Sequence, residues 1–274
     1  MKVLMINGSP RKEGNTSIAL QEMEKIFQAE GIEVETVSIG GKDIRGCIAC
    51  GQCHAKGKCV FDDLVNETAP KFEACDGLVV ASPVYYASAN GTLISFLDRL
   101  FYSTPFDKTM KVGASVVVAR RGGLSATFDE LNKYFTICGM PVASSQYWNG
   151  VHGREKGEAA QDAEGLQTMR TLARNMAFLL KSIALGKAQY GLPERCAGAG
   201  RRPAPWRLAR CARGVETAQM RCLAPLFVWR NSLRCRGGAC AVRGRAEGPP
   251  PWRLARRTRE VEARRRIRPP EQEV

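Results

Sequence analysis

Apolar and polar positions follow two alternating patterns through the first 195 residues of the chain. Short continuous apolar runs are typical of strands buried in a parallel sheet. They alternate with longer segments whose apolar residues recur every three or four positions, a pattern typical of amphipathic helices. The predicted strands are residues 2–7, 33–39, 76–82, 111–119 and 140–148. The predicted helices are residues 15–30, 62–74, 91–102, 124–138 and 165–185.

This order of strands and helices predicts an α/β fold, with a five-stranded parallel sheet covered by helices on both faces and right-handed crossovers. Ligands of such sheets bind beyond the carboxyl ends of the strands, where the strand order reverses. Three loops follow predicted strands at that edge, namely residues 8–16, 83–90 and 120–124. These loops are therefore the candidate binding loops.

The first of them, NGSPRKEGNTS at residues 7–17, joins a buried strand to a helix, which is the usual setting of a phosphate site. Its hydroxyl, amide and cationic groups belong to Ser9, Arg11, Asn15, Thr16 and Ser17. The loop matches neither the dinucleotide fingerprint nor the P-loop pattern, so a single terminal phosphate is the favoured ligand. The alternative is an ordinary turn followed by a helix cap.

The other two loops carry groups suited to a flat ring. Pro83, Tyr85 and Tyr86 form a stiff aromatic loop that could lie against a planar ring system. The sequence RRGG at residues 120–123 places two cations beside a flexible backbone. Glycine allows a ligand to approach the backbone closely, and N–H groups or arginine could meet electron-rich ring edges.

Four cysteines lie close together in GCIACGQCHAKGKC, namely Cys47, Cys50, Cys53 and Cys59. The spacing C-x2-C-x2-C-x5-C can wrap a [4Fe–4S] cluster. A single zinc ion is a second interpretation, although overlapping pairs crowd one ion. A loop without metal is the third. Disulfides are disfavoured if the protein is cytoplasmic, which we expect because no apolar run reaches ~18 residues and the N-terminus does not resemble a signal peptide.

The net charge of +14 comes almost entirely from the C-terminal part of the chain. Residues 1–195 carry 22 basic and 21 acidic side chains, whereas residues 196–274 carry 19 and 6, and all 19 are arginine. Arg, Ala, Gly and Pro supply 46 of those 79 residues. Such a composition predicts a low-complexity, disordered tail. It is either an arginine-rich arm for RNA or anionic surfaces, or the product of a shifted reading frame, which the absence of Lys and Asp favours.

Four segments together resemble the flavodoxin-like NADPH-dependent FMN reductases: GSPRKEGNTS, SPVYYASANGTLISFLDRL, ARRGGLSATFDELNKYF and MPVASSQYWNGVHG. The cysteine segment is similar to that of the iron-sulfur flavoprotein subgroup. The resemblance covers about residues 1–193 and stops there. It implies a sheet of order 2-1-3-4-5, an FMN domain over residues 1–195, and dimers or tetramers with FMN near the interface.

The resemblance also implies the cofactor contacts. The phosphate of FMN would be held by Ser9, Arg11, Asn15, Thr16 and Ser17. The ring and ribityl chain would contact Pro83, Val84, Tyr85, Tyr86, Arg120, Arg121 and Gly122. The expected activity is transfer of electrons from NAD(P)H through FMN to a quinone, a flavin, another small acceptor or a redox protein, with the flavin carrying the chemistry in place of catalytic side chains.

Two other functions stay open on the sequence. The first is a flavodoxin-like electron carrier, which the near-neutral charge of residues 1–195 disfavours, because such carriers tend to be acidic. The second is nucleic-acid binding through the basic tail, which the sparse aromatic residues there disfavour.

Overall fold

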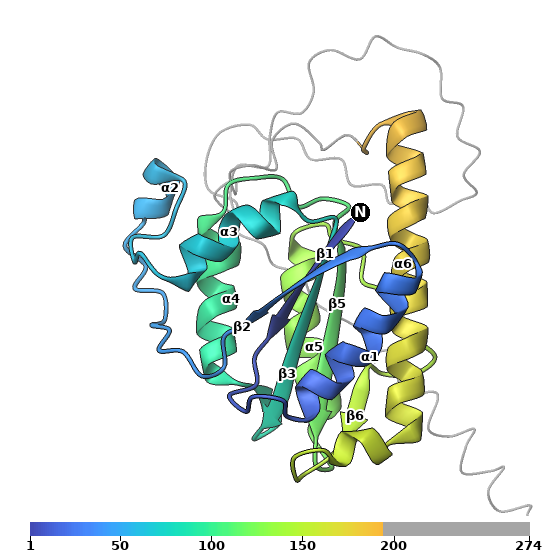
Figure 1. Cartoon of the computed structure of the whole chain (residues 1–274). Helices are drawn as coiled ribbons and strands as arrows, with labels where there is room; N and C mark the ends of the chain where they lie inside the picture. The colour runs from blue at the N-terminus through green and yellow to red at the C-terminus, as the bar shows by residue number, and fades with distance from the viewer. Residues whose placement is uncertain (194–274) are drawn as a thin grey trace, which may run out of the picture. The chain divides into compact units, whose positions relative to one another are not determined.

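The computed structural model describes residues 1–193, so the predicted tail at residues 196–274 lies outside the described part. The elements form one alternating series of strands and helices (Figure 1). They are β1 (Lys2–Asn7), α1 (Asn15–Ala29), β2 (Glu33–Ser38), α2 (Gln52–Lys56), α3 (Leu64–Ala74), β3 (Gly77–Tyr85), β4 (Ser88–Ala89), α4 (Gly91–Ser103), β5 (Val112–Ala119), α5 (Leu124–Ile137), β6 (Gly150–His152), the 3-10 helix η1 (Glu158–Gln161) and α6 (Ala163–Tyr190).

Five strands run parallel in the order β2-β1-β3-β5-β6. When the two-residue strand β4 is set aside, this is the predicted order 2-1-3-4-5, so the flavodoxin-like fold is confirmed. Strand β4 instead pairs antiparallel with the end of β3, which it meets at Val84 and Tyr85. The strand order reverses between β1 and β3, and the ligand edge of the sheet is therefore expected there.

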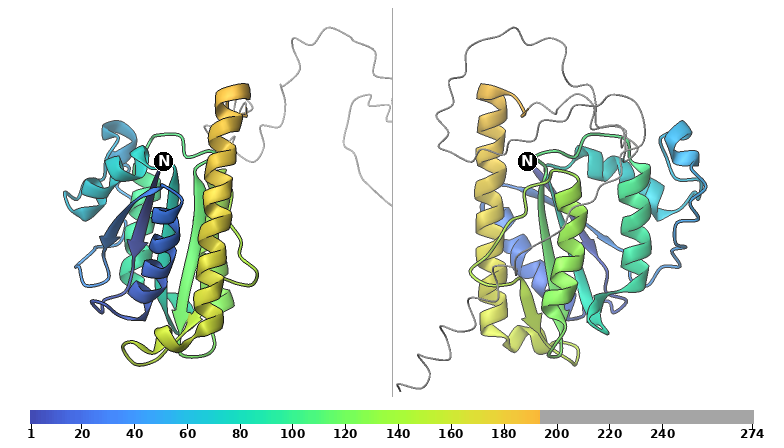
Figure 2. Two further views of the ribbon diagram at one scale, coloured as in Figure 1. Left: turned by 45° about the vertical axis from the view of Figure 1, so that its right-hand side comes forward. Right: turned by 180° about the vertical axis from the view of Figure 1, so that it is seen from behind.

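The central strands are buried on both sides because apolar side chains point to both faces of the sheet. In β1, Val3 and Met5 belong to one core, whereas Leu4 and Ile6 belong to the other. Helices α1 and α6 cover the first face, and α3, α4 and α5 cover the second (Figures 1 and 2). Each fully buried aliphatic side chain contributes about 1.5–3 kcal/mol of transfer free energy, so the two cores hold the strand ends in place.

The prediction of a fifth strand at residues 140–148 is wrong. That segment makes only an isolated bridge between Gly113 and Val142, and the fifth strand is Gly150–His152, which pairs with the end of β5. Met140 and Ala143 are buried all the same. Their burial explains the misleading apolar pattern, since these residues pack as a loop beside the start of β5.

Several predicted boundaries also shift. Strand β3 does not stop at Pro83, which is still in register with Val118, and it runs on to Tyr85. Helix α3 begins at Leu64 and not at residue 62, and Asp63 caps it because its carboxylate accepts a hydrogen bond from the backbone N–H of Val65. Helix α6 continues past Gly186 to Tyr190. In the described part of the chain, no helix has the length and apolar character needed to cross a membrane.

Candidate functional site

A cavity of about 180 Å³ lies at the carboxyl ends of β1, β3, β5 and β6, and we call it the strand-end cavity. It brings together eight of the predicted cofactor-binding residues, which come from all three candidate loops. They are Ser9, Arg11, Asn15, Thr16, Pro83, Val84, Tyr85 and Arg120. Residues far apart in sequence thus line one cavity at the edge where the fold places ligands.

Four predicted contact residues do not line this cavity. The Ser17 hydroxyl accepts a hydrogen bond of 3.1 Å from Nδ2 of Asn7. Tyr86 lies fully exposed in the turn between β3 and β4. Arg121 and Gly122 line a neighbouring cavity of about 340 Å³, together with Trp148 and other residues.

Four further residues line the strand-end cavity but were not predicted: Val118, Ala119, Gly153 and Arg154. Gly153 and Arg154 follow directly on β6. Ligands bind beyond the carboxyl ends of parallel strands. Gly153 and Arg154 would therefore have been candidates if the fifth strand had been predicted at residues 150–152 and not at 140–148.

The start of helix α1 gives the cavity an anion-binding character. Gly14 precedes the helix without a side-chain cap, and the first turn holds no acidic residue. The N–H groups of a helix start and the helix dipole both favour a negative charge there. Arg11, Arg120 and Arg154 also line the cavity. A doubly charged phosphate group is well matched to this combination.

Asn15 has a structural role in this cavity. Its Nδ2 donates to the Glu155 carbonyl over 2.8 Å, and its Oδ1 accepts from the N–H groups of Gly157 and Ala159 over 3.0 and 3.2 Å. The side chain therefore ties the start of α1 to the segment that follows β6, and it fixes the position of Gly153 and Arg154.

Two residues that sequence reasoning missed hold the first loop in shape. A Cβ at Gly40 would collide with the backbone of Gly8 and Ser9, so only glycine fits there. Asn90 is buried, donates from Nδ2 to the Gly8 carbonyl over 2.8 Å, and caps α4 by accepting from the Thr92 N–H over 2.8 Å. Asn90 lies in one of the predicted loops, but its role was missed because it acts on a loop that is distant in sequence, as Gly40 does.

The turn between β3 and β4 is strained. Tyr86 and Ala87 have φ angles of 50° and 60°. Residues other than glycine adopt this left-handed conformation at a cost of about 1–3 kcal/mol each. Glu130 of α5 holds the turn by accepting from the Ser88 hydroxyl and from the Ala89 N–H, both over 2.9 Å. The structure thus maintains an exposed tyrosine beside the strand-end cavity.

The four cysteines line a second, much smaller hollow of about 20 Å³. Cys47 and Cys50 are exposed, whereas Cys53 and Cys59 are half-buried. Burial raises the pKa of the Cys53 thiol, and the charges of the three neighbouring cysteines raise it further. Within residues 1–193, no group of three or more His, Cys, Asp or Glu side chains is already arranged to hold a metal ion.

The two sites lie at different points along α4. Asn90, at the start of this helix, contacts the first loop, whereas Arg99 lies beside the cysteines. Nine residues of helix correspond to about 13 Å. In Figure 1, α2 and the cysteine segment accordingly lie toward the end of α4 that is farther from the strand-end cavity.

The strand order defines a flavodoxin-like protein, with a cavity at the strand ends that Arg11, Arg120 and Arg154 line. A family model described as NADPH-dependent FMN reductase matches residues 1–155, and the chain belongs to this family.

Among its relatives is the iron-sulfur flavoprotein MJ1083 of Methanocaldococcus jannaschii, which is 35% identical over an alignment of 194 residues that covers 67% of this chain and 99% of that protein. An iron-sulfur flavoprotein of Methanosarcina thermophila is 33% identical over 188 residues, 67% of this chain and 97% of its own.

Solved structures with low sequence identity share the fold. The RosB protein with a bound riboflavin-phosphate intermediate has a TM-score of 0.54 at 14% identity, covering 80% of this chain and all of its own. FerB of Paracoccus denitrificans, an NAD(P)H:acceptor oxidoreductase, has a TM-score of 0.50 at 13% identity, covering 66% and 97%.

Proposed function

We propose that this protein is an FMN-dependent NAD(P)H oxidoreductase that delivers electrons to a quinone, a flavin, another small acceptor or a redox protein. The observation that carries the proposal is the strand-end cavity, where eight residues of three separate loops meet at the uncapped start of α1. The family membership supports the same conclusion.

The phosphate of FMN would lie at the start of α1, against Ser9, Arg11 and Thr16. The Ser9 hydroxyl accepts from the Arg11 N–H over 3.3 Å, which leaves its own proton available to a ligand. Arg11 donates from Nη1 to the Arg154 carbonyl over 3.1 Å, so its guanidinium is held at the rim of the cavity. Asn15 and Ser17 support this loop through contacts within the protein.

The flavin ring would lie toward Pro83, Val84 and Tyr85, with Tyr86, Arg120, Arg121 and Gly122 around it. Bound FMN supplies the hydride-accepting chemistry, so the protein needs to position the cofactor and tune its charge and does not need a catalytic triad. Tyr85 is 45% exposed at the cavity. A large aromatic surface left open to solvent can cover a flat ring.

We also propose that Cys47, Cys50, Cys53 and Cys59 hold a [4Fe–4S] cluster. Four thiols that line one hollow are the required donor set. Such a cluster would supply single-electron transfer. Zinc is the alternative ion for this set, and iron and sulfide content distinguishes the two.

Anaerobic titration with NADPH and NADH tests the proposed activity. The purified protein should show the visible flavin absorption band, and one of the two nucleotides should bleach it. If the band is missing, or if neither nucleotide bleaches it, the reductase proposal is lost. Slow bleaching combined with a stable one-electron reduced flavin would favour a flavodoxin-like electron carrier.

A cytoplasmic homodimer or homotetramer is part of this proposal. Tyr147 and Trp148 are more than half exposed and contact each other, and Phe178 and Leu185 of α6 are about 70% exposed. Exposed apolar side chains of this size are a common feature of interfaces. Light scattering at several concentrations measures the assembly directly.

A further inference from the structure

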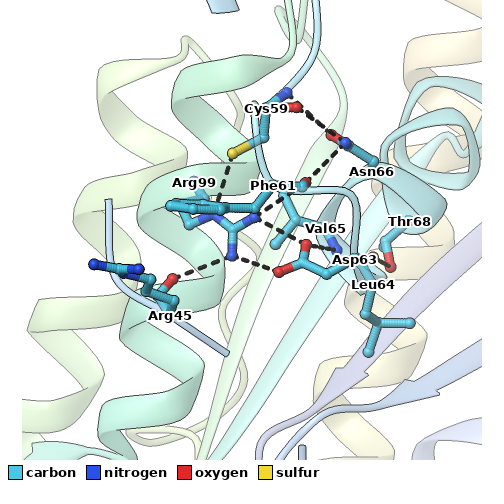
Figure 3. Close-up of polar contacts among 9 residues, drawn as sticks. All are labelled: Arg45, Cys59, Phe61, Asp63, Leu64, Val65, Asn66, Thr68 and Arg99. Atoms are coloured by element: carbon cyan, nitrogen blue, oxygen red, sulfur yellow. Dashed lines mark hydrogen bonds and ion pairs between the residues drawn. The ribbon is translucent and has the colours of Figure 1, made fainter. Parts of the chain in front are cut away.

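Arg99 of α4 is the largest fully buried side chain in the described part of the chain. Its side chain is 0% exposed, and its guanidinium lies between the two ends of the cysteine segment (Figure 3). A buried cation is costly unless charged and polar partners surround it. The contacts that compensate for this cost are therefore informative about what Arg99 does.

Every N–H-bearing nitrogen of the guanidinium has a partner in the cysteine segment or directly beside it. Nη1 and Nη2 donate to the two carboxylate oxygens of Asp63 over 2.7 and 2.9 Å. Nη1 also donates to the Arg45 carbonyl over 3.1 Å, and the Phe61 ring lies 4.9 Å from the guanidinium carbon. Arg99 thus joins the residues before Cys47 to the residues after Cys59.

The remaining nitrogen, Nε, donates to the sulfur of Cys59 over 3.2 Å. Asn66 fixes the backbone of the same cysteine, because its Oδ1 accepts from the Cys59 N–H and its Nδ2 donates to the Cys59 carbonyl, both over 3.0 Å. Cys59 is therefore held at its sulfur and at both backbone polar atoms. Cys47 and Cys50, in contrast, are exposed.

From this geometry we infer that Arg99 is a positioning residue, which fixes Cys59 as the anchoring ligand of the cysteine site and donates an N–H to its sulfur. This inference rests on the proposed cluster. Asp63 already balances the charge of Arg99. Arg99 therefore acts on a bound thiolate through one directed N–H donor and by fixing the position of the sulfur. It does not act through an excess of positive charge.

Hydrogen bonds to the sulfur ligands are one of the factors that set the reduction potential of a cluster. An N–H donor stabilises the more negative, reduced state, so removal of Arg99 should make the potential more negative. The anchoring also predicts that the cluster is released faster once Cys59 is free to move. Mutation of residues that hydrogen-bond to metal ligands typically lowers metal affinity by about 10- to 100-fold.

The test uses the anaerobically purified full chain in four forms: wild type, Arg99→Lys, the double variant Arg99→Met with Asp63→Asn, and Arg45→Met. The double variant removes both charges, so it leaves no unpaired buried ion. Asparagine can still cap α3. Arg45→Met is the matched control, because it removes a guanidinium stacked over the same Phe61 ring at 5.4 Å but keeps the carbonyl that accepts from Arg99.

Four properties are measured: iron and sulfide content, the rate of iron loss to a chelator, the reduction potential of the cluster, and hydrogen exchange of peptides covering residues 59–66. The reduction potential comes from a redox titration in which electron paramagnetic resonance follows the reduced cluster. We expect the double variant to lose iron about tenfold faster or more and to have a more negative potential. Arg99→Lys should lie between it and wild type, and Arg45→Met should match wild type. Flavin bleaching by NAD(P)H should stay within twofold throughout, which keeps this result separate from the proposed reductase activity.

An unchanged rate of iron loss and an unchanged potential in the double variant would overturn the inference. If the wild-type protein contains neither iron nor sulfide, the cluster proposal itself fails, and hydrogen exchange then decides the positioning role. Exchange over residues 59–66 that is faster in the double variant but not in Arg45→Met supports a fixed Cys59. Equal exchange in all four forms contradicts it.

Discussion

At the scale of single residues, polar side chains of the same loop have different tasks. Asn15 is buried and forms three hydrogen bonds with the segment after β6. Arg11 is exposed, and its guanidinium contacts the protein through the Arg154 carbonyl. The sequence indicated both residues as phosphate ligands. Their burial and partners distinguish them, because both polar atoms of the Asn15 side chain bond within the protein, whereas the exposed guanidinium of Arg11 has several N–H groups that can donate to a ligand.

We predict that Arg11→Ala weakens FMN binding by about tenfold or more, because a hydrogen bond to a charged group contributes about 1.5–3 kcal/mol. Riboflavin, which lacks the phosphate, should bind both forms equally. Quenching of flavin fluorescence on binding measures both affinities. Lys12→Ala is the control, since Lys12 is the next residue but does not line the cavity. Equal losses for FMN and riboflavin would show that Arg11 does not contact the phosphate.

At the scale of elements, the buried strands and the main helices were predictable because they bury continuous or periodic apolar sets. Strand β6 was not predictable, because three residues are too few to show a periodic pattern. The strand was predicted instead at the more apolar segment 140–148. Pairing with the end of β5 selects residues 150–152. That choice depends on a neighbouring strand, which local sequence does not contain.

Asn90 links three elements, and its replacement should separate its roles. Asn90→Ala removes the cap of α4 and the bond to the Gly8 carbonyl, so the free energy of unfolding should fall by about 2–3 kcal/mol. Asn90→Ser restores a capping oxygen but cannot reach Gly8, and it should recover about 1 kcal/mol. Denaturant unfolding measures both. FMN affinity should be reduced in both variants, and full affinity in Asn90→Ser would contradict a role in shaping the first loop.

Helices α1 and α6 are joined by an ion pair whose effect should depend on pH. Hydrogen bonds from Lys25 and Arg170, over 2.8 and 2.6 Å, lower the pKa of Glu22 below its ordinary value. A lowered folded-state pKa contributes stability that is complete above the ordinary glutamate pKa and is lost as the pH falls through the lowered one. Glu22→Gln should therefore cost about 0.5–1 kcal/mol near neutral pH, a value that allows for the partial exposure of Arg170.

Thermal unfolding of both forms across the acid range tests this pH dependence. The melting temperatures should differ near neutral pH and converge in acid, below the ordinary glutamate range. Glu24→Gln is a suitable control on the same helix, because Glu24 accepts a hydrogen bond from the neutral side chain of Gln28. A constant difference at all pH values would assign the effect of Glu22 to packing and not to its charge.

At the scale of the whole molecule, the location of the candidate site could be predicted, but the long-range contacts that shape it could not. The rule that ligands lie at the carboxyl ends of parallel strands selected three loops, and eight of the twelve residues that the family resemblance implied in or next to those loops line one cavity. Gly40 and Asn90 shape that cavity by meeting Gly8 and Ser9 from elsewhere in the chain. Arg99 reaches Cys59 from α4 in a similar way. Such contacts depend on the tertiary structure and cannot be predicted from local sequence.

Residues 1–195 should fold and bind FMN without the arginine-rich residues that follow them. The described residues 1–193 form two apolar cores, and 67% of this chain covers 97–99% of two matched relatives. A chain that ends after residue 195 should therefore keep the melting temperature, the FMN affinity and the NAD(P)H-dependent bleaching of the full chain. Its net charge falls from +14 to +1.

Any RNA binding by the full chain at low salt should weaken steeply as salt is added and should vanish on truncation, because it would depend on the 19 arginines of residues 196–274. Filter binding at several salt concentrations, carried out beside the flavin titration, measures both properties on the same samples. RNA binding that survives moderate salt in the full chain would restore the nucleic-acid hypothesis. A loss of flavin from the truncated chain would place part of the cofactor site beyond residue 195.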